Sequence, residues 1–287
     1  MICIAGMPRS GTSLAAQLLH RCGVEIGPAD QLMPPSSNNS DGFWENLRFV
    51  DLNERLLRAS GATWFAPPRT LRPAPALAKE AAAIIAQFDG KEPWLWKDPR
   101  NAITLPFWKA LLPPMKVVLC IRHPAETAAS LVASSLIPPM RSFYWRITRA
   151  DSLIRLREGE ARLDRRLMGI VHTSISQEKR RAVIYEAGLQ LWRIYNTRAL
   201  EETNPADRIV THYEDVLANP RDELARILDF AGVRVSPDVL AEAVRAVSPV
   251  LRHQHAGAAQ LDPGVEALYA GLLREARAPR TSANISA

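Results

Sequence analysis

Cysteine is scarce in this sequence, and the three that occur form no pattern. Cys3, Cys22 and Cys120 each lie among apolar residues, and none belongs to a C-x-x-C pair or to a spacing typical of zinc ligands. We therefore expect three buried, reduced thiols, with neither a disulfide framework nor a metal site.

Long apolar runs are also absent. No stretch approaches the roughly 20 apolar residues that span a bilayer, and the sequence opens inside an apolar segment without the features of a signal peptide. We therefore expect a cytoplasmic protein. A length of 287 residues with 47% hydrophobic content allows one large core. Alternating strand and helix patterns predict a single α/β domain over residues 1–277 and a flexible tail over 278–287.

The lysine of nucleoside-triphosphatases is missing from the first glycine-rich turn. Residues 2–5 predict a short buried strand, and an apolar-periodic helix follows the turn. Such a turn directs backbone N–H groups and the positive end of the helix dipole at one point, which suits a tetrahedral anion. In a nucleoside-triphosphatase, Lys would follow Gly11. Here Thr12 and Ser13 follow directly, and the cation is Arg9 inside the turn.

A second junction between a strand and a helix carries a further cation. Residues 116–121 form an apolar run of strand length, which Arg122 ends before a helix that begins near Ala125. Ser130 lies eight residues beyond Arg122. A guanidinium suits phosphate because its planar fork can donate two parallel, charge-assisted hydrogen bonds.

A third block lies nearer the C-terminus. Residues 208–220 predict a strand and then a turn at 219–220, and residues 223–233 predict an amphipathic helix that Gly232 ends. Tyr213 lies at the end of this strand. Its side chain suits either packing at the strand end or contact with a ligand, because it has an apolar body and a polar tip.

Together these blocks resemble the sulfotransferases that use 3'-phosphoadenosine 5'-phosphosulfate (PAPS), over about residues 1–233. The matching patterns are P-R-S-G-T-S after the first strand, an Arg and a Ser at the second junction, and Y-E-D-x-x-x-N-P before the last helix. The resemblance is to the bacterial branch of that superfamily. It implies a P-loop-like three-layer α/β sandwich with a central parallel sheet and a helical insertion, and a PAPS-dependent transfer without a metal.

The resemblance also implies roles for individual residues. Arg122 and Ser130 would hold the 3'-phosphate of PAPS, and Tyr213 would lie against the adenine. Many members carry Lys at the position of Arg9, and cytosolic members carry Trp at the position of Leu14. The loop that would hold the phosphosulfate consists of Pro8, Arg9, Ser10, Gly11, Thr12 and Ser13.

Sulfuryl transfer to a hydroxyl needs a cation on the leaving side and a general base near the acceptor. The resemblance assigns the first role to Arg9. Glu45 is the preferred base, because relatives with glycan or tyrosine acceptors place a Glu after the first helix and loop. Cytosolic members carry K-T-H where this chain has Lys97, Asp98 and Pro99. Lys97 would help to hold the sulfonate, and Asp98 either acts as the base or orients Arg100.

The acceptor is less clearly encoded. Four tryptophans in candidate loops suit a carbohydrate or lipid-linked carbohydrate hydroxyl, because aromatic faces stack on sugars: Trp44, Trp64, Trp94 and Trp96. A phenolic or aliphatic alcohol natural product suits the same residues. From other classes, a P-loop nucleotide kinase and a non-catalytic nucleotide-binding protein are the alternatives. Both the missing lysine and the pair of Arg122 with Ser130 disfavour the kinase.

The formal charge of +6 comes from one segment. Residues 141–181 contain eleven basic and five acidic residues, and the two signs balance elsewhere. This segment is the core of a predicted basic helical insertion over 134–186. A solvated helical face, a lid over an anionic acceptor and a peripheral contact with an acidic membrane all fit it. No reader motif for nucleic acid accompanies the charge. A second, smaller basic cluster at 251–255 fits an exposed loop.

Overall fold

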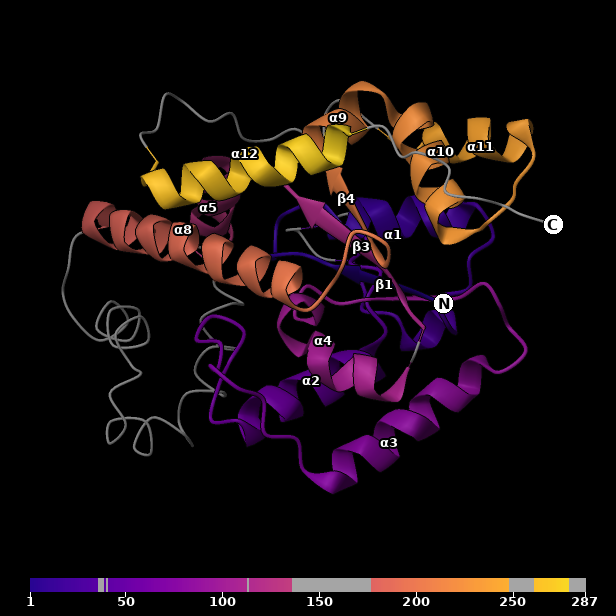
Figure 1. Ribbon diagram of the computed structural model, residues 1–287, viewed down its shortest axis with the longest axis horizontal. Helices are drawn as coiled ribbons and strands as arrows, with labels where there is room; N and C mark the ends of the chain where they lie inside the picture. The colour runs from indigo at the N-terminus through magenta and orange to yellow at the C-terminus, as the bar shows by residue number, and fades with distance from the viewer. Residues whose placement is uncertain (36–38, 40, 113, 136–176, 248–260, 279–287) are drawn as a thin grey trace.

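The centre of the fold is a sheet of four parallel strands (Figure 1). A computed structural model describes residues 1–35, 39, 41–112, 114–135, 177–247 and 261–278. The strands lie in the order β2-β1-β3-β4. Their bounds are Ile2–Ala5 for β1, Leu95–Lys97 for β2, Lys116–Ile121 for β3 and Arg208–His212 for β4.

Helices cover both faces of this sheet. Figure 1 shows α2, α3 and α4 on one side and α10 and α11 on the other. The first face is covered by α2 (Leu47–Ala59), α3 (Pro75–Ile85), α4 (Asn101–Leu111), α5 (Pro124–Ser135), α8 (Gln177–Glu201) and α12 (Pro263–Arg277). The second face is covered by α1 (Thr12–Arg21), α9 (Tyr213–Ala218), α10 (Pro220–Ala231) and α11 (Pro237–Val244). Two short 3-10 helices complete the described part, η1 (Ala29–Gln31) and η2 (Ala86–Phe88).

Alternating side chains of each strand divide the interior into two cores. Cys3 and Ala5 pack into the first core, and Ile2 and Ile4 pack into the second. This division follows from the two-residue period of a strand, which turns successive side chains to opposite faces. Because both faces are covered, the strands are nearly continuous apolar runs. The predicted three-layer α/β sandwich with a central parallel sheet is confirmed.

All four strands end at the same edge of the sheet, because they are parallel. The first residue after β1 is Gly6, β2 ends at Lys97, Arg122 follows β3, and Tyr213 follows β4. Each predicted functional segment therefore begins at this one edge. The carboxyl ends of strands in open α/β sheets are also where ligands bind.

An aromatic cluster forms the middle of the first core. The ring centroids of Phe88 and Trp94 lie 4.5 Å apart, and those of Phe49 and Trp96 lie 5.7 Å apart. The indole of Trp108 packs on this cluster and donates its N–H to Asn53 Oδ1 at 2.9 Å. Trp94 and Trp96 are buried core residues. The expectation that these two tryptophans belong to acceptor-binding loops is therefore wrong.

The third sequence block contains one helix more than predicted. β4 ends at His212, and Tyr213 begins the short helix α9 before α10 starts at Pro220. The predicted stop at Gly232 is confirmed, since this residue caps α10 in the left-handed conformation with φ of 72°. Tyr213 is therefore the first residue of a helix, beyond the strand end.

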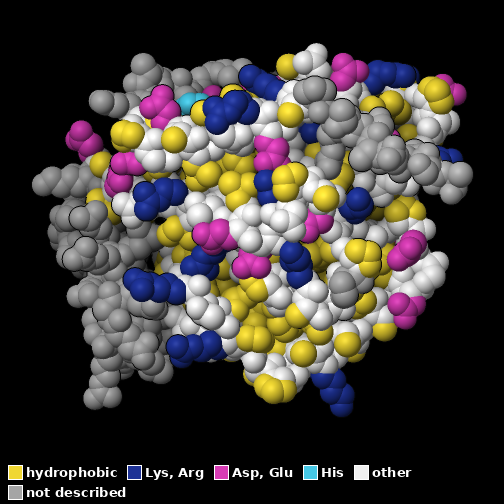
Figure 2. All heavy atoms as spheres, in the orientation of Figure 1, with side chains coloured by type: hydrophobic (Ala, Val, Ile, Leu, Met, Phe, Trp, Pro, Cys, Tyr) yellow, Lys and Arg dark blue, Asp and Glu magenta, His cyan; other side chains and the backbone are white. Residues whose placement is uncertain are grey.

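The three cysteines are buried and unpaired, as predicted. Among the helices that the structure describes, none is both long and apolar enough to cross a membrane. Figure 2 shows basic and acidic side chains interspersed over one face of the described surface, in keeping with the balance of charge outside residues 141–181.

Three predicted segments lie mostly outside the described residues. Of the insertion at 134–186, only the end of α5 and the first part of α8 are described. The basic segment 141–181 is described only from 177 onward, and the cluster at 251–255 is not described. The same holds for the tail over 278–287, apart from Ala278. The predictions for these segments stay predictions.

Gly6 tests the contact between the first turn and β3. A methyl group at Gly6 would lie 2.4 Å from the carbonyl oxygen of Cys120, and φ is 149°. We expect Gly6→Ala to lower the free energy of unfolding by about 3 kcal/mol. As a control, Gly61 has φ of 65° but no atom within 4 Å of such a methyl group, so Gly61→Ala isolates the backbone strain, at about 1 kcal/mol. If urea unfolding gave the same loss of unfolding free energy for Gly6→Ala and Gly61→Ala, the contact with β3 would contribute nothing to the effect at Gly6.

Candidate active site

The turn after β1 has the geometry of an anion-binding loop. The backbone N–H of Ser10 donates to Met7 O at 3.1 Å, and Gly11, the N-cap residue of α1, has φ of 89°. No side chain caps the N-terminus of α1, and its first turn holds no acidic residue. The first N–H groups of the helix and the positive end of its dipole are therefore directed at the loop.

Two features of this loop point to a ligand. Arg9 has φ of 75°, a conformation that costs energy for a residue other than glycine and is most often retained at functional sites. The Ser10 hydroxyl oxygen is buried without a hydrogen-bond partner. Because buried polar groups are normally satisfied, this hydroxyl fits a bound oxyanion. Gly11 lies against Tyr213, where a methyl group would come within 2.5 Å of the ring.

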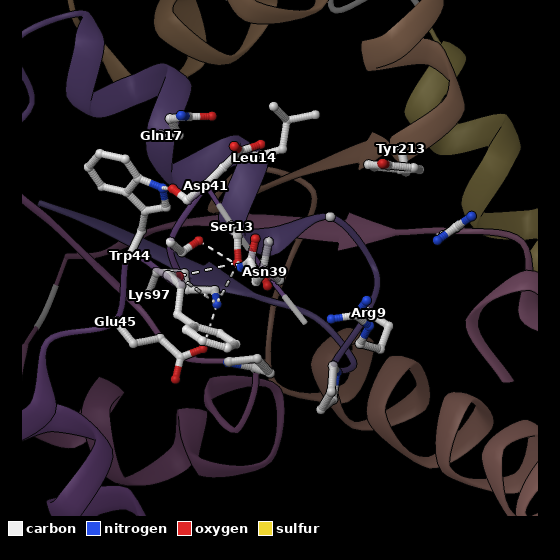
Figure 3. A pocket seen from close by; sticks show the side chains of 17 residues that line it. Arg9, Ser13, Leu14, Gln17, Asn39, Asp41, Trp44, Glu45, Lys97 and Tyr213 are labelled. Carbon is white, nitrogen blue, oxygen red and sulfur yellow. Dashed lines mark hydrogen bonds and ion pairs between the residues drawn. The ribbon is translucent and has the colours of Figure 1, made fainter. Parts of the chain in front are cut away.

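A pocket of about 280 Å³ opens beside this loop. Figure 3 shows Arg9 and Tyr213 on one side of it, and Lys97, Glu45 and Trp44 on the other. Of the predicted site residues, nine line it: Pro8, Arg9, Gly11, Thr12, Ser13, Glu45, Lys97, Arg122 and Tyr213. Ser10, Asp98 and Ser130 are outside that lining.

The side of the pocket opposite Arg9 is built around the Lys97 ammonium. Lys97 Nζ lies 2.6 Å from Glu45 Oε1, and both side chains are almost completely buried. The ammonium also donates to Phe43 O at 3.0 Å and to Ser13 Oγ at 3.2 Å (Figure 3). Ser13 accepts a further hydrogen bond from Asn39 Nδ2 at 3.2 Å. The segment after β1, Lys97 and Glu45 therefore belong to one hydrogen-bonded network.

Asp98 is directed away from the pocket into the core. It is fully buried, and Arg100 Nη1 donates to its two oxygens at 2.9 and 2.8 Å. Asn53 Nδ2 donates to Asp98 Oδ2 at 2.8 Å. Although burial opposes its charge, the Asp98 carboxylate, with Glu45 and Glu54, raises the pKa of Arg100 above its ordinary value. This geometry favours the orienting role for Asp98 over the role of general base.

Arg9 and Ser130 lie far apart in the sequence and are hydrogen-bonded in the structure. Arg9 Nε donates to Ser130 Oγ at 2.9 Å, across 121 residues of chain. Burial, together with the nearby Arg122 cation, lowers the pKa of Arg9. Two guanidinium groups that line one pocket favour a ligand with more than one negative charge.

Arg122 already has carboxylate neighbours. Its Nε and Nη2 donate to Glu126 Oε2 at 3.1 and 2.9 Å, and its Nε lies 3.5 Å from Glu214 Oε1. The guanidinium also lies over the Tyr213 ring, 4.8 Å from its centroid. An anion that binds Arg122 therefore competes with two carboxylates.

Sequence reasoning missed several residues of the site. Glu126 could have been found, because it lies in the first turn of the predicted helix, only four residues after Arg122. Glu214 belongs to the Y-E-D pattern, but the pattern alone does not indicate a role for its carboxylate. Asn39 and Asp41 belong to an irregular loop whose course the sequence pattern does not predict. Within the described residues, no group of three or more His, Cys, Asp or Glu side chains is arranged to hold a metal.

The buried ion pair of Lys97 and Glu45 makes a testable contribution to stability. Lys97→Met leaves the Glu45 carboxylate buried without its countercharge, and we expect the free energy of unfolding to fall by about 3 kcal/mol. The double variant Lys97→Met with Glu45→Gln removes both charges and should recover part of that loss. Urea unfolding of the single and double variants measures the coupling. Additive losses would contradict a direct interaction between the two groups.

The comparisons with known proteins agree with the fold. The structure is similar to the sulfotransferase domain from the curacin biosynthetic pathway, with a TM-score of 0.50, 16% identity, and coverage of 95% of this chain and 97% of that one. Two others are the sulfotransferase domain of the Synechococcus PCC 7002 olefin synthase and a sulfotransferase of Mycobacterium tuberculosis H37Rv. Both have a TM-score of 0.48, with identities of 17% and 16%. Coverage is 95% of this chain and 94% of the first, and 94% of this chain and 75% of the second.

A search of curated proteins gave no match. The family model described as "Sulfotransferase family" matches residues 2–186, which is more than half of the chain and includes the anion-binding loop, Lys97 and Arg122. This protein therefore belongs to the sulfotransferase family.

Proposed function

We propose that this protein transfers a sulfuryl group from PAPS to a hydroxyl of a carbohydrate or glycolipid, with Glu45 as the general base. The observation that carries the proposal is the shared pocket, in which the Arg9 loop, Lys97 with Glu45, and Arg122 with Tyr213 come together from the ends of four strands. One end of this pocket suits a doubly phosphorylated nucleotide, and the other suits proton removal.

The fit to PAPS rests on the cations and on the loop. The unpartnered Ser10 hydroxyl and the uncapped N-terminus of α1 suit its 5'-phosphate group. Arg122, with Ser130 held near by Arg9, suits the 3'-phosphate. Tyr213, which packs on Gly11 and under Arg122, offers an aromatic face to the adenine. PAPS supplies a sulfuryl group attached to a phosphate leaving group.

The residues of the chain would then divide the chemistry between two sides. Glu45 accepts the proton of the acceptor hydroxyl as the hydroxyl oxygen bonds to sulfur. When the Glu45 carboxylate is neutralised, Lys97 becomes an uncompensated cation beside the transferred group and stabilises its negative oxygens. On the opposite side Arg9 donates hydrogen bonds to the phosphate that leaves. Asp98 contributes by holding Arg100 and Asn53 in the wall behind Lys97.

The proposed acceptor class rests on Trp44. This residue has φ of 57°, unusual for a large side chain, and its indole N–H donates to Asp41 O at 2.9 Å. It lines the pocket next to Glu45 together with Asn39 and Asp41. A fixed aromatic side chain beside polar groups suits a sugar ring, which combines apolar C–H faces with hydroxyl edges.

Nucleotide binding tests the donor. We expect calorimetry to show that 3'-phosphoadenosine 5'-phosphate (PAP) binds at least about tenfold more tightly than AMP, which lacks the 3'-phosphate. Arg122→Gln should remove most of this difference and affect AMP much less. Arg245→Gln, at an exposed site paired with Glu242, is the matched control and should keep it. Equal affinities of the wild type for PAP and AMP would rule out the proposed donor.

Transfer of labelled sulfate from PAPS tests the acceptor and the base. Over a panel of saccharides, glycolipids, phenols and aliphatic alcohols, we expect product with the first two classes. With the best acceptor, Glu45→Gln should lower kcat by about 100-fold or more, since a general base contributes that much. Asp98→Asn should lower stability more than kcat. Full turnover by Glu45→Gln, together with a folded but inactive Asp98→Asn, would transfer the role of base to Asp98.

A further inference from the structure

His212 is a buried histidine with a carboxylate on each side of its ring. Its Nε2 lies 2.7 Å from Glu214 Oε2, and its Nδ1 lies 3.3 Å from Asp215 Oδ1. The Tyr269 hydroxyl is also 2.9 Å from Nε2. A neutral imidazole has one N–H, whereas an imidazolium has two. Because each ring nitrogen faces a carboxylate oxygen, the surrounding negative charge favours the protonated ring.

The neighbours of His212 come from three further elements. On α12, which lies beside β4 (Figure 1), Tyr269 contacts the ring, and Arg277 donates to Asp215 at 2.8 and 2.9 Å. On α5, Glu126 shares the Arg122 guanidinium with Glu214. Between β3 and α5, His123 packs on Tyr269 with ring centroids 5.1 Å apart. Although burial opposes the charge, Glu214 and Asp215 raise the pKa of His212.

Glu214 connects this histidine to the pocket. One of its carboxylate oxygens contacts His212, and the other lies 3.5 Å from Arg122 Nε. Arg122 lines the pocket and is the cation to which we assign the 3'-phosphate. A charge on His212 therefore offsets that of Glu214, the carboxylate that contacts both His212 and Arg122.

We propose that His212 is a positioning residue for the anion end of the pocket, which as an imidazolium holds Glu214 and offsets its charge so that Arg122 binds the phosphate of the donor. This inference rests on the proposed use of PAPS. When His212 loses its proton, Glu214 becomes an uncompensated negative charge beside Arg122. Affinity for the phosphate should then fall.

Binding of the anion should weaken as the pH rises through the pKa of His212. Below the pKa of His212, the His212 and Glu214 pair is neutral, and binding of the anion is strongest. Above that pKa the pair carries one negative charge, and binding weakens. The 3'-phosphate of PAP also titrates near neutral pH, and it gains charge as the pH rises. For this reason, the affinity of each variant for PAP is compared with that of the wild type at the same pH.

Calorimetric titration with PAP between pH 6 and pH 9 tests the proposal. We expect His212→Gln to bind PAP about tenfold more weakly than the wild type at pH 6, and with nearly equal affinity at pH 9. His20→Gln, on α1, is the matched control and should follow the wild-type curve. If the ratio between His212→Gln and the wild type does not change with pH, the proposal is overturned. A wild type that fails to bind PAP at any pH would instead overturn the proposed function.

A variant of Glu214 tests the same ion pair without changing His212, whose buried ring could be needed for folding. Glu214→Gln removes the negative charge beside Arg122. It should therefore bind PAP about tenfold more tightly than the wild type at pH 9. Circular dichroism of each variant establishes that it is folded. Weaker binding by folded Glu214→Gln at pH 9 would contradict the proposal.

Discussion

The parallel pairing of β1 with β2 on one side and β3 on the other is the constraint on which the site depends. This pairing brings the turn after β1 beside Lys97, the last residue of β2, and Arg122, the first residue after β3. The pairing of β3 with β4 adds Tyr213 and Glu214 at the same edge. Gly6 keeps the turn close to β3, where a larger residue would meet backbone. The order of the strands therefore places the segments that line the pocket, and the side chains then determine what the pocket can bind.

Several buried cations of this structure are each paired with a carboxylate. Lys97 is paired with Glu45, Arg100 with Asp98, and Arg122 with Glu126. Each pair offsets part of the cost of burying its two charges. They also mean that an anionic ligand must compete with carboxylates for the lysine and for the arginine. In such a site, binding and catalysis depend on how each carboxylate is itself held, and not only on the number of cations.

Much of the fold and of the candidate site could be predicted from local sequence. The features that could not be predicted share one cause, which is that they depend on contacts between distant residues. The strand, turn and helix of the first block depend on neighbours a few residues apart, and so do the end of α10 at Gly232 and the sulfotransferase motifs. The failed expectation for Trp94 and Trp96 is different. An indole looks the same in sequence whether it packs in a core or faces a ligand, and only the cluster with Phe49, Phe88 and Trp108 decides which.

By itself, the sequence determined the three-layer α/β class, the strand, turn and helix of the first block and membership of the sulfotransferase family, because these depend on periodicity and on short contiguous motifs. Only the tertiary structure decided which carboxylate accompanies which cation. Glu45 and Lys97 are 52 residues apart, and Arg9 and Ser130 are 121 apart. No local pattern encodes such partners. They meet because parallel strands end at one edge, where packing brings distant side chains within reach of a hydrogen bond.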